Sequence, residues 1–359
     1  MTNLTIAIDC MGGDFGPSVT IPAIKFFIKN QTPLKSTENF TSQPKNNSQT
    51  GMIRFQLFGN KAVLSDYLEE YKLTDHPLIE VLESEDDVLM TDKPSLALKK
   101  KKRSSMRLAL EAVRDGRANA CVSAGNTGAL MAISRFILKM LPGIDRPAII
   151  SALPTIENGA VYLLDLGANV DCNEQRLAQF AIMGNELCKS VDGVASPRVG
   201  LLNVGEEEIK GSEKLRLADK LITNLDGINY CGFVEGNQIF SGNYQVVVTD
   251  GFTGNNVLKA SEGFSLFLLS RIKHAFQKNW WTKFIGLLAK PVISLFKEEL
   301  NPERYNGACL IGLRGVVIKS HGSANVNATV CAIEEAISQA KQKLPSRIKQ
   351  RLEIANSLS

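Results

Sequence analysis

The stretch ACVSAGNTGALMAISRFIL, residues 120–138, passes from a short apolar run through a glycine-containing turn into a segment with helical spacing. Residues 120–122 are continuously apolar, as a strand buried on both faces should be. Residues 123–128 follow this run and open directly into the helical segment around 130–138. A strand, a tight loop and a helix in this order form the repeating unit of α/β folds with a mainly parallel sheet.

The same alternation extends in both directions along the chain. Further apolar runs lie at 4–8, 53–58, 79–82, 160–164, 198–202, 230–234, 244–248, 308–311 and 315–318, and helical patterns lie at 104–114, 127–141 and 173–189. We therefore predict a single α/β catalytic domain over residues 1–359, built in three layers around a largely parallel sheet.

Two segments depart from the strand-and-helix pattern. Residues 32–51 are polar with few apolar side chains, which predicts an exposed insertion. Residues 257–305 keep helical spacing and contain both tryptophans of the protein, Trp280 and Trp281, side by side. We expect this second segment to form a protruding helical hairpin.

Composition sets limits on function and location. The 359 residues are 44% hydrophobic and 22% charged, and the net charge of +4 is too small to indicate a nucleic-acid partner. Seven cysteines without a C-x-x-C pair favour the reducing cytoplasm. Neither a signal peptide nor an apolar run of membrane-spanning length is visible, so we expect a cytoplasmic protein.

Six glycine- or amide-containing loops follow apolar runs. They lie at 9–14, 123–128, 165–171, 203–208, 250–255 and 321–325. In open α/β sheets, ligands bind beyond the carboxyl ends of the strands, where such loops would meet. Glycine lets backbone N–H groups approach an anion, and a following helix adds its positive end. Any one loop could merely connect two elements, but six together favour a shared anion site, with 123–128 as its best phosphate cradle.

Several other chemistries lack their motifs. The sequence has no G-x-x-x-x-G-K-[ST] and no G-x-G-x-x-G, so the P-loop and the dinucleotide fingerprint are both missing. It also has no G-x-S-x-G, no H-x4-D and no catalytic zinc spacing. We therefore expect no cofactor and no metal.

Five long motifs point to one family. DCMGGD at 9–14, SAGNTG at 123–128, DLGANVDC at 165–172, NVGEEEIKG at 203–211 and DGFTGN at 250–255 resemble, in order, those of the PlsX phosphate acyltransferases of bacterial phospholipid synthesis. The resemblance covers nearly the whole chain. It departs at the 32–51 insertion and at a lysine-rich run, 99–103, neither of which touches a motif.

The resemblance implies both a reaction and a fold. The reaction transfers a long-chain acyl group from acyl carrier protein to inorganic phosphate. The acyl phosphate then passes to a membrane glycerol-3-phosphate acyltransferase. The implied fold is similar to that of phosphotransacetylases and of isocitrate and isopropylmalate dehydrogenases.

Roles for individual residues follow from this chemistry. Phosphate is itself a nucleophile, so no covalent enzyme intermediate is needed; Cys172 has no histidine nearby in sequence, which favours a packing role. Asp9 and Asp250 would orient donors, and Lys210 would supply a cation. Asn255, with the backbone of 251–254, would bind the thioester carbonyl, and His321 would donate to the oxyanion or to the thiolate. The phosphate would be held by Ser123, Gly125, Asn126, Thr127 and Gly128.

Two surface features predict partners. The basic run 99–103 and Arg107 form either a solvated helix face or a docking surface for the acidic carrier protein, with Lys100, Lys101, Arg103 and Arg107 as its contacts. The hairpin forms a dimer interface, a lipid contact or both. We expect a homodimer through its base, 257–276, and contact with the inner face of the cell membrane at its tip. The tip residues are Trp280, Trp281, Phe284, Leu287 and Leu288.

Three other functions compete with this interpretation. A phosphotransacetylase using short acyl-CoA is the nearest, but the basic run and the apolar hairpin favour a long-chain substrate on a carrier protein. A decarboxylating dehydrogenase would need aspartates for a divalent metal and a nucleotide site. A non-catalytic membrane scaffold would leave the six polar loops without a purpose.

Overall fold

The computed structural model describes residues 3–31, 52–157, 159–207, 209–299 and 306–357, so the polar insertion 32–51 lies outside the described residues. The chain forms two compact units. Unit 1 comprises Met1–Leu141 and Asn306–Ser346, and unit 2 comprises Pro142–Tyr305 and Arg347–Ser359. Helix α12, Leu344–Ser357, passes from the first unit into the second.

Unit 1 is built on strands whose order is β3-β2-β1-β4-β11-β10. All neighbouring strands run parallel except β10 and β11. Ile6, Phe55 and Leu57 are buried, as expected for apolar side chains of strands covered by helices. The strands are β1 (Leu4–Asp9), β2 (Ile53–Gly59), β3 (Ile79–Glu83), β4 (Ala120–Ser123), β10 (Ala308–Ile311) and β11 (Val316–Lys319).

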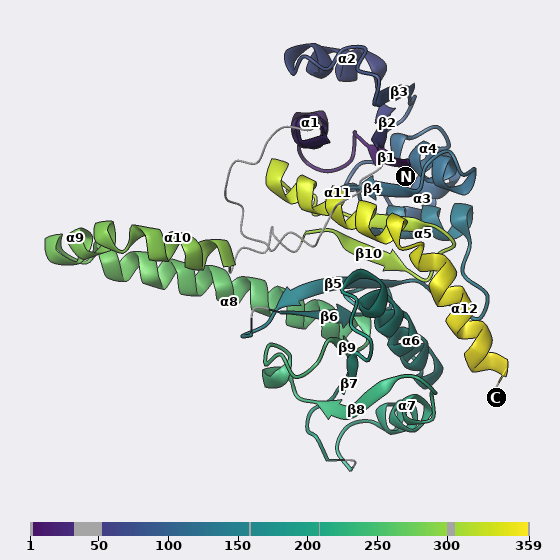
Figure 1. Cartoon of the computed structure of the whole chain (residues 1–359), viewed down its shortest axis with the longest axis vertical. Helices are drawn as coiled ribbons and strands as arrows, with labels where there is room; N and C mark the ends of the chain where they lie inside the picture. The colour runs from purple at the N-terminus through teal and green to yellow at the C-terminus, as the bar shows by residue number, and fades with distance from the viewer. Residues whose placement is uncertain (1–2, 32–51, 158, 208, 300–305, 358–359) are drawn as a thin grey trace. The chain divides into compact units, whose positions relative to one another are not determined.

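Helices cover both faces of these strands (Figure 1). Helices α1 and α11 pack together on one face, and α4 packs with α5 on the other. Ser104 caps α4 by accepting from the Arg107 amide, which explains why this helix begins where the sequence pattern predicted it. The helices of unit 1 are α1 (Pro17–Gln31), α2 (Lys61–Glu70), α3 (Pro94–Lys100), α4 (Ser105–Arg114), α5 (Thr127–Leu138) and α11 (Val326–Lys341).

Unit 2 has the strand order β5-β6-β9-β7-β8. Strands β5 and β6 pair antiparallel, and the other pairs are parallel. The strands are β5 (Ala148–Pro154), β6 (Ala160–Leu164), β7 (Arg198–Leu202), β8 (Asn229–Val234) and β9 (Val246–Val248). Helices α6 (Glu174–Val191) and α7 (Glu213–Thr223) pack together beside them, and a short 3-10 helix, η1 (Gly236–Gln238), follows β8.

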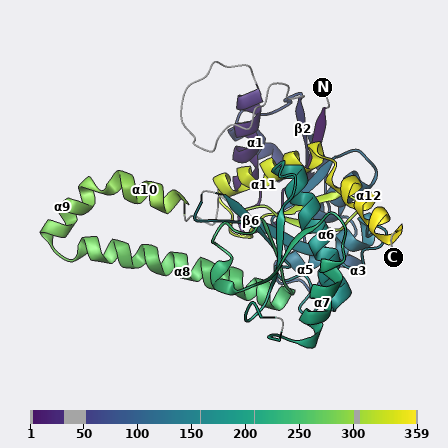
Figure 2. The same cartoon turned by 60° about the horizontal axis from the view of Figure 1, so that its bottom comes forward.

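The apolar segment with both tryptophans belongs to unit 2. The long helix α8 (Gly251–Gln277) is followed by α9 (Trp280–Leu288) and α10 (Lys290–Glu299). Helices α9 and α10 return alongside α8 in both views (Figures 1 and 2), and Gly286 of α9 lies against the Phe276 ring of α8. Asn279 turns the chain between α8 and α9 and caps α9 by accepting from the Thr282 amide.

The predicted α/β organisation with mainly parallel strands is confirmed, and each predicted strand is present. The sequence pattern missed one strand, β5. It also placed a loop at 250–255, where the structure is helical from Gly251 onward. Asp250 accepts from the Thr253 amide at 2.8 Å and so starts α8 six residues before residue 257, where its apolar periodicity begins.

Candidate functional site

Three polar residues end neighbouring strands of unit 1 in one row. Asp9 of β1 is in register with Ser123 of β4, and Ser123 is in register with Lys319 of β11. Residues in register on parallel strands point to the same face. All three are buried, and their exposed fractions are 2% for Asp9, 1% for Ser123 and 8% for Lys319. Buried ionisable side chains at the carboxyl ends of parallel strands mark a candidate functional site.

The Asp9 carboxylate organises this row. It accepts hydrogen bonds from the hydroxyls of Ser123 and of Ser105, the first residue of α4, each at 2.6 Å. Burial raises the pKa of Asp9, and the two serine hydroxyls oppose that rise because they stabilise the charged form. Each carboxylate oxygen thus accepts from a hydroxyl of its own unit. The carboxylate holds β4 and α4 in place rather than facing a ligand.

Three of the predicted loops interlock above this row. A Cβ at Gly12 would lie 2.7 Å from the Gly125 nitrogen, and one at Gly13 would lie 2.9 Å from the Gly322 carbonyl oxygen. The Asp14 amide donates to that same carbonyl at 2.8 Å. Only glycine permits backbones to approach this closely. Unit 1 therefore brings together the loops 9–14, 123–128 and 321–325.

The predicted phosphate cradle starts helix α5. The Asn126 side chain accepts from the Ala129 amide at 3.0 Å and donates to the carbonyls of Met90 and Asp92 at 2.8 and 3.0 Å. Asn126 therefore caps α5 and also holds the segment that contains Met90 and Asp92. Thr127 and Gly128 occupy the first two helical positions, whose amides have no acceptor inside a helix. These two amides at a positive helix end are suited to an anion.

His321 lies on the third loop and is exposed. Its Nδ1 accepts from the Ser323 amide at 3.3 Å and lies 2.8 Å from the Ser323 hydroxyl. With Nδ1 accepting from the amide, Nε2 is the ring nitrogen that can act as a donor.

Lys319 is a candidate that the sequence interpretation missed. Its ammonium donates to the carbonyl oxygens of Ala124, at 3.3 Å, and of Ser320. Burial lowers the pKa of Lys319 to about 8, although the charges of Asp9 and Asp14 oppose that change. The available signal was a lysine that ends the apolar run 315–318 immediately before a glycine-containing loop.

Unit 2 contains a second buried aspartate at a strand end. Asp165 follows β6 and accepts from the amides of Ile149, Ala168 and Asn169 at 2.9, 3.0 and 2.6 Å. It also accepts from the Asn169 side chain at 2.9 Å. Burial raises the pKa of Asp165, and these donors oppose the rise. Four hydrogen bonds fix the backbone of the loop 165–171 from within.

The start of α8 packs tightly on this loop. The Gly251 amide donates to the Asn169 carbonyl at 2.8 Å. A Cβ at Gly254 would lie only 2.0 Å from the Asp165 carbonyl oxygen. Asp250 caps α8, and Asn255 is exposed on its first turn. The loops 165–171 and 250–255 thus form one cluster within unit 2.

Lys210 lies on the third loop of unit 2. Its ammonium pairs with Glu207 at 2.7 Å, and its carbonyl accepts from the Asn203 side chain at 3.2 Å. The Glu207 carboxylate raises the pKa of Lys210, so this exposed amine stays charged at neutral pH. Lys214, which follows this loop, pairs with Asp171 of the loop 165–171 at 2.5 Å and so links the two loops.

Cys172 is buried, and burial raises the pKa of its thiol to about 11. At neutral pH this sulfur is almost entirely protonated, and a thiol is a poor nucleophile. The geometry gives no support to a covalent acyl-cysteine. In the parts of the chain that the structure describes, no group of His, Cys, Asp or Glu side chains is arranged to hold a metal ion.

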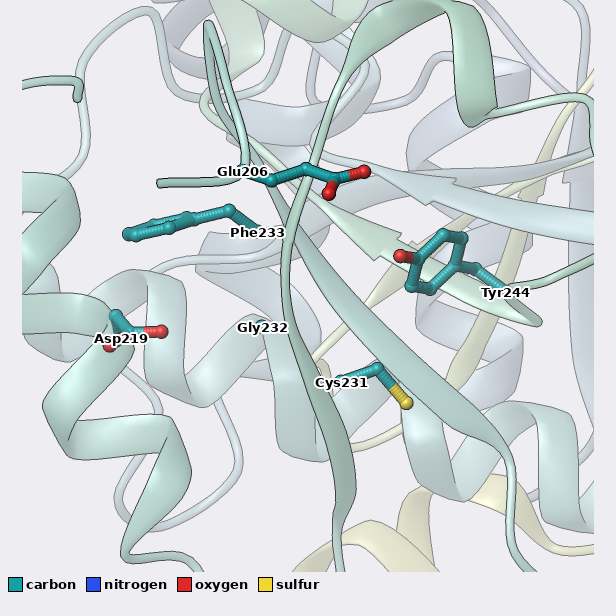
Figure 3. Close-up of a pocket in the computed structure, with 6 residues that line it drawn as sticks. All are labelled: Glu206, Asp219, Cys231, Gly232, Phe233 and Tyr244. Atoms are coloured by element: carbon teal, nitrogen blue, oxygen red, sulfur yellow. The ribbon is translucent and has the colours of Figure 1, made fainter. Parts of the chain in front are cut away.

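A pocket of about 300 Å³ opens on unit 2 beside the loop 203–208 (Figure 3). It is lined by Glu206, Asp219, Cys231, Gly232, Phe233 and Tyr244. The two carboxylates would repel phosphate. Asp219 is also already bonded to the Tyr230 hydroxyl at 2.6 Å. The charge of its lining therefore makes this pocket unsuited to phosphate.

Some of the residues predicted for carrier-protein docking are exposed, and others are held in ion pairs with acidic neighbours. In the basic run, Lys99, Lys100 and Lys102 are exposed. The other predicted contacts are held by acidic neighbours, in the ion pairs Lys101–Asp92 at 2.8 Å, Arg103–Glu85 at 2.6 Å and Arg107–Glu111 at 3.0 Å. Helix α3, which carries the start of the run, packs its Pro94 ring against Gly128 of the cradle.

The apolar side chains of α9 are exposed. Trp280 and Trp281 stack on each other with ring centroids 3.9 Å apart. Their exposed fractions are 66% and 59%, and Phe284, Leu287 and Leu288 are similarly open. Among the described residues, no helix is long and apolar enough to cross a membrane.

Comparisons with known proteins identify the family and the fold. Residues 4–347 match the model of a family described as fatty acid synthesis protein. A phosphate acyltransferase of Shewanella sp. (strain MR-4) is 47% identical over 353 residues, which is 98% of each chain.

Among solved structures, a phosphotransacetylase from Streptococcus pyogenes has a TM-score of 0.60 at 14% identity and covers 95% of this chain and 94% of its own. EutD phosphotransacetylase from Staphylococcus aureus has a TM-score of 0.57 at 15% identity and covers 94% of both chains. The predicted likeness to the phosphotransacetylase fold is confirmed.

Proposed function

The chain belongs to the PlsX family of phosphate acyltransferases, and from this premise we propose that it transfers a long-chain acyl group from acyl carrier protein to inorganic phosphate. The observation that carries the proposal is the cluster of unit 1. There, three glycine-containing loops and the start of α5 surround buried Asp9, Ser123 and Lys319. Helix-end amides and a nearby cation are the groups that bind an inorganic anion.

The proposed reaction needs no cofactor. A phosphate oxygen attacks the thioester carbonyl, the carbon–oxygen bond forms, and the carbon–sulfur bond breaks. The proton of hydrogen phosphate ends on the leaving sulfur, a thiol of pKa about 8.5. The Thr127 and Gly128 amides hold the phosphate, and the Nε2 proton of His321 stabilises the developing negative charge. The roles predicted for Lys210 and Asn255 stay predictions within unit 2, where Asp250 caps the helix that carries Asn255 and Glu207 pairs with Lys210.

One assay separates this function from its nearest rival. Purified protein is incubated with phosphate and either long-chain acyl-carrier protein or a short acyl-CoA, and acyl phosphate is trapped with hydroxylamine. We expect hydroxamate from the carrier-bound substrate and little from the short acyl-CoA. The reverse preference would favour a phosphotransacetylase, and no hydroxamate from either would refute both.

We propose that the carrier protein docks beside the cradle on the basic run. Helix α3 begins against Gly128 and ends in Lys99 and Lys100, so the exposed ammonium groups lie one short helix from the phosphate site. Exposed cations steer an acidic partner, whereas cations already paired contribute less. This shifts the proposed contacts from Lys101 and Arg107 toward Lys99, Lys100 and Lys102.

Charge reversal tests the docking surface. Lys99→Glu/Lys100→Glu should raise KM for acyl-carrier protein roughly tenfold at low salt and leave KM for phosphate unchanged. Lys61→Glu/Lys341→Glu makes the same change of charge at exposed positions elsewhere on unit 1 and should have no effect. Equal KM values for the two double variants would remove the docking assignment.

We propose that α9 lies in the membrane interface and that the chain forms a homodimer through α8. Exposed Trp, Phe and Leu side chains on one short helix bind at the lipid boundary, where a membrane glycerol-3-phosphate acyltransferase could receive acyl phosphate. On α8, Phe264 and Phe267 are 64% and 59% exposed, and apolar patches of this kind mark interaction sites.

Two variants separate lipid contact from dimer contact. Trp280→Glu/Leu288→Glu should abolish sedimentation with anionic vesicles without changing the sedimentation coefficient in solution. Phe264→Glu/Phe267→Glu should give monomers in analytical ultracentrifugation. Leu217→Glu, an exposed apolar position on α7, serves as the control for both. Vesicle binding that survives in the first variant would contradict the lipid assignment.

A further inference from the structure

Lys319 lies at the junction of the three loops of unit 1. Its ammonium is 3.3 Å from the Ala124 carbonyl oxygen, which faces the close approaches of Gly13 and Gly322. The register with Ser123 places the lysine directly beside the strand that carries the phosphate cradle. The cation thus lies beside the strand end from which the Thr127 and Gly128 amides follow at the start of α5.

The ammonium has bonding capacity left for a ligand. It has three N–H donors, and the carbonyls of Ala124 and Ser320 accept two of them. Within the described residues, no third acceptor lies within hydrogen-bonding distance of this nitrogen. A buried ammonium without a carboxylate in contact is costly, and such costs are typical of functional sites.

We propose that Lys319 is a catalytic residue of this enzyme, whose ammonium binds the inorganic phosphate that attacks the thioester. The inference rests on the proposed acyl transfer to phosphate and adds to it the cation of unit 1. Lys319 contributes charge and one hydrogen bond and does not exchange its proton during turnover. Its contact stabilises the phosphate dianion beside the amides of Thr127 and Gly128.

The surroundings of Lys319 define when this cation is present. The groups that face it from neighbouring elements are Asp9 of β1, Asp14 of the following loop, Ser123 of β4 and, through Asp9, Ser105 of α4. Burial favours the neutral amine, and the two carboxylates favour the charged form. The balance puts the pKa near 8, so phosphate binding should weaken as the pH rises through that value.

Lys210 of unit 2 does not lose its proton in the same pH range. Glu207 raises the pKa of Lys210 above its ordinary value of 10.5, so Lys210 stays charged where Lys319 loses its proton. Inorganic phosphate also keeps its dianionic charge between pH of about 8 and 10. A decline of kcat/KM for phosphate over that range therefore reports a protein group.

The test compares three proteins with matched lysine substitutions. Lys319→Met removes the cation and keeps the length of the side chain, Lys319→Arg keeps a cation that does not titrate, and Lys61→Met removes an exposed lysine as a control. With acyl-carrier protein saturating, Lys319→Met should lower kcat/KM for phosphate roughly 30-fold or more, while KM for acyl-carrier protein stays within about twofold. Lys61→Met should behave as the wild type.

The pH dependence of the wild-type enzyme is a second measurement, and it does not require any variant to fold. It should lose about tenfold in kcat/KM for phosphate per pH unit above about 8, and Lys319→Arg should lack that decline. A folded Lys319→Met protein with normal kcat/KM for phosphate would overturn the inference, and so would a wild-type profile that stays flat to pH of about 10. If the wild type forms no acyl phosphate, the proposed function itself is wrong, which is a different outcome.

Discussion

Replacing Lys319 with methionine should change how stability depends on pH. In the folded protein, burial holds the pKa of Lys319 at about 8, against 10.5 for an ordinary lysine. Between these values the unfolded chain binds more protons than the folded one, so the free energy of unfolding rises with pH. The cost of the buried ammonium is fully present below pH 8 and is gone above pH 10.5.

The size of the effect follows from the gap between the two pKa values. Each pKa unit corresponds to about 1.4 kcal/mol, so the gap is worth roughly 3 kcal/mol. The methionine variant has no such dependence. Its advantage in unfolding free energy over the wild type should therefore shrink by roughly 3 kcal/mol between pH of about 7 and 10.5, whatever its value at the start. Hydrogen bonds lost at the Ala124 and Ser320 carbonyls shift that starting value and do not alter the slope.

Urea unfolding at several pH values measures this difference. Because two compact units can unfold separately, circular dichroism is combined with pulsed proteolysis and detection of peptides from β4 and β11. All other titrating groups cancel between the variant and the wild type. Lys61→Met, an exposed lysine, should run parallel to the wild type at every pH. If Lys319→Met also runs parallel, the buried lysine has an ordinary pKa and the reasoning fails.

Four further substitutions test the close approaches of the glycines and the roles of two buried side chains. Gly254→Ala should destabilise the protein by roughly 3 kcal/mol or more, since its Cβ would lie 2.0 Å from the carbonyl oxygen of Asp165. Gly263→Ala on the same helix should stabilise the protein by about 0.5–1 kcal/mol, because its Cβ meets no atom within 4 Å. The urea unfolding midpoints of the two variants measure this difference. Ser105→Ala removes a 2.6 Å hydrogen bond to buried Asp9 and should lower the unfolding free energy by roughly 1–3 kcal/mol, and an unchanged value would mean that water replaces the hydroxyl. Cys172→Ala should retain turnover, because a thiol with a pKa of about 11 is protonated at neutral pH; an acylated Cys172 peptide in mass spectrometry would contradict this.

Sequence patterns predicted every strand of the sheet except β5, and they placed polar loops after several of these strands. Continuous apolar runs identified the buried strands, and the glycines marked where backbones approach one another, as Gly12 and Gly125 do. The pattern could not reveal which loops share a unit, because that depends on strand order. Asp9 and Ser123 lie 114 positions apart and meet only because β1 pairs with β4.

The charged residues were harder to interpret from sequence for the same reason. Lys101 looks as available as Lys100 in a basic run, but its acidic partner Asp92 appears only in three dimensions, whereas Glu111 lies four residues after Arg107 on the predicted helix and was readable from spacing. Lys319 was missed because a lysine at the end of an apolar run also suits an exposed strand end. Its burial depends on the neighbouring strands and on the loops that close above it.

The two units solve the same problem in the same way. Asp9 and Asp165 are each buried at a strand end, each accepts hydrogen bonds from its own unit, and each lies against a glycine that admits no side chain. A buried carboxylate fixes a loop firmly but places a negative charge beneath it, and that charge opposes an anion bound above. Unit 1 offsets the charge of Asp9 with the ammonium of Lys319 in the same row. A loop held this way can be both rigid and attractive to phosphate. This requires Lys319 to remain buried and charged at the same time. The pH at which Lys319 loses its proton then sets the upper pH limit of phosphate binding.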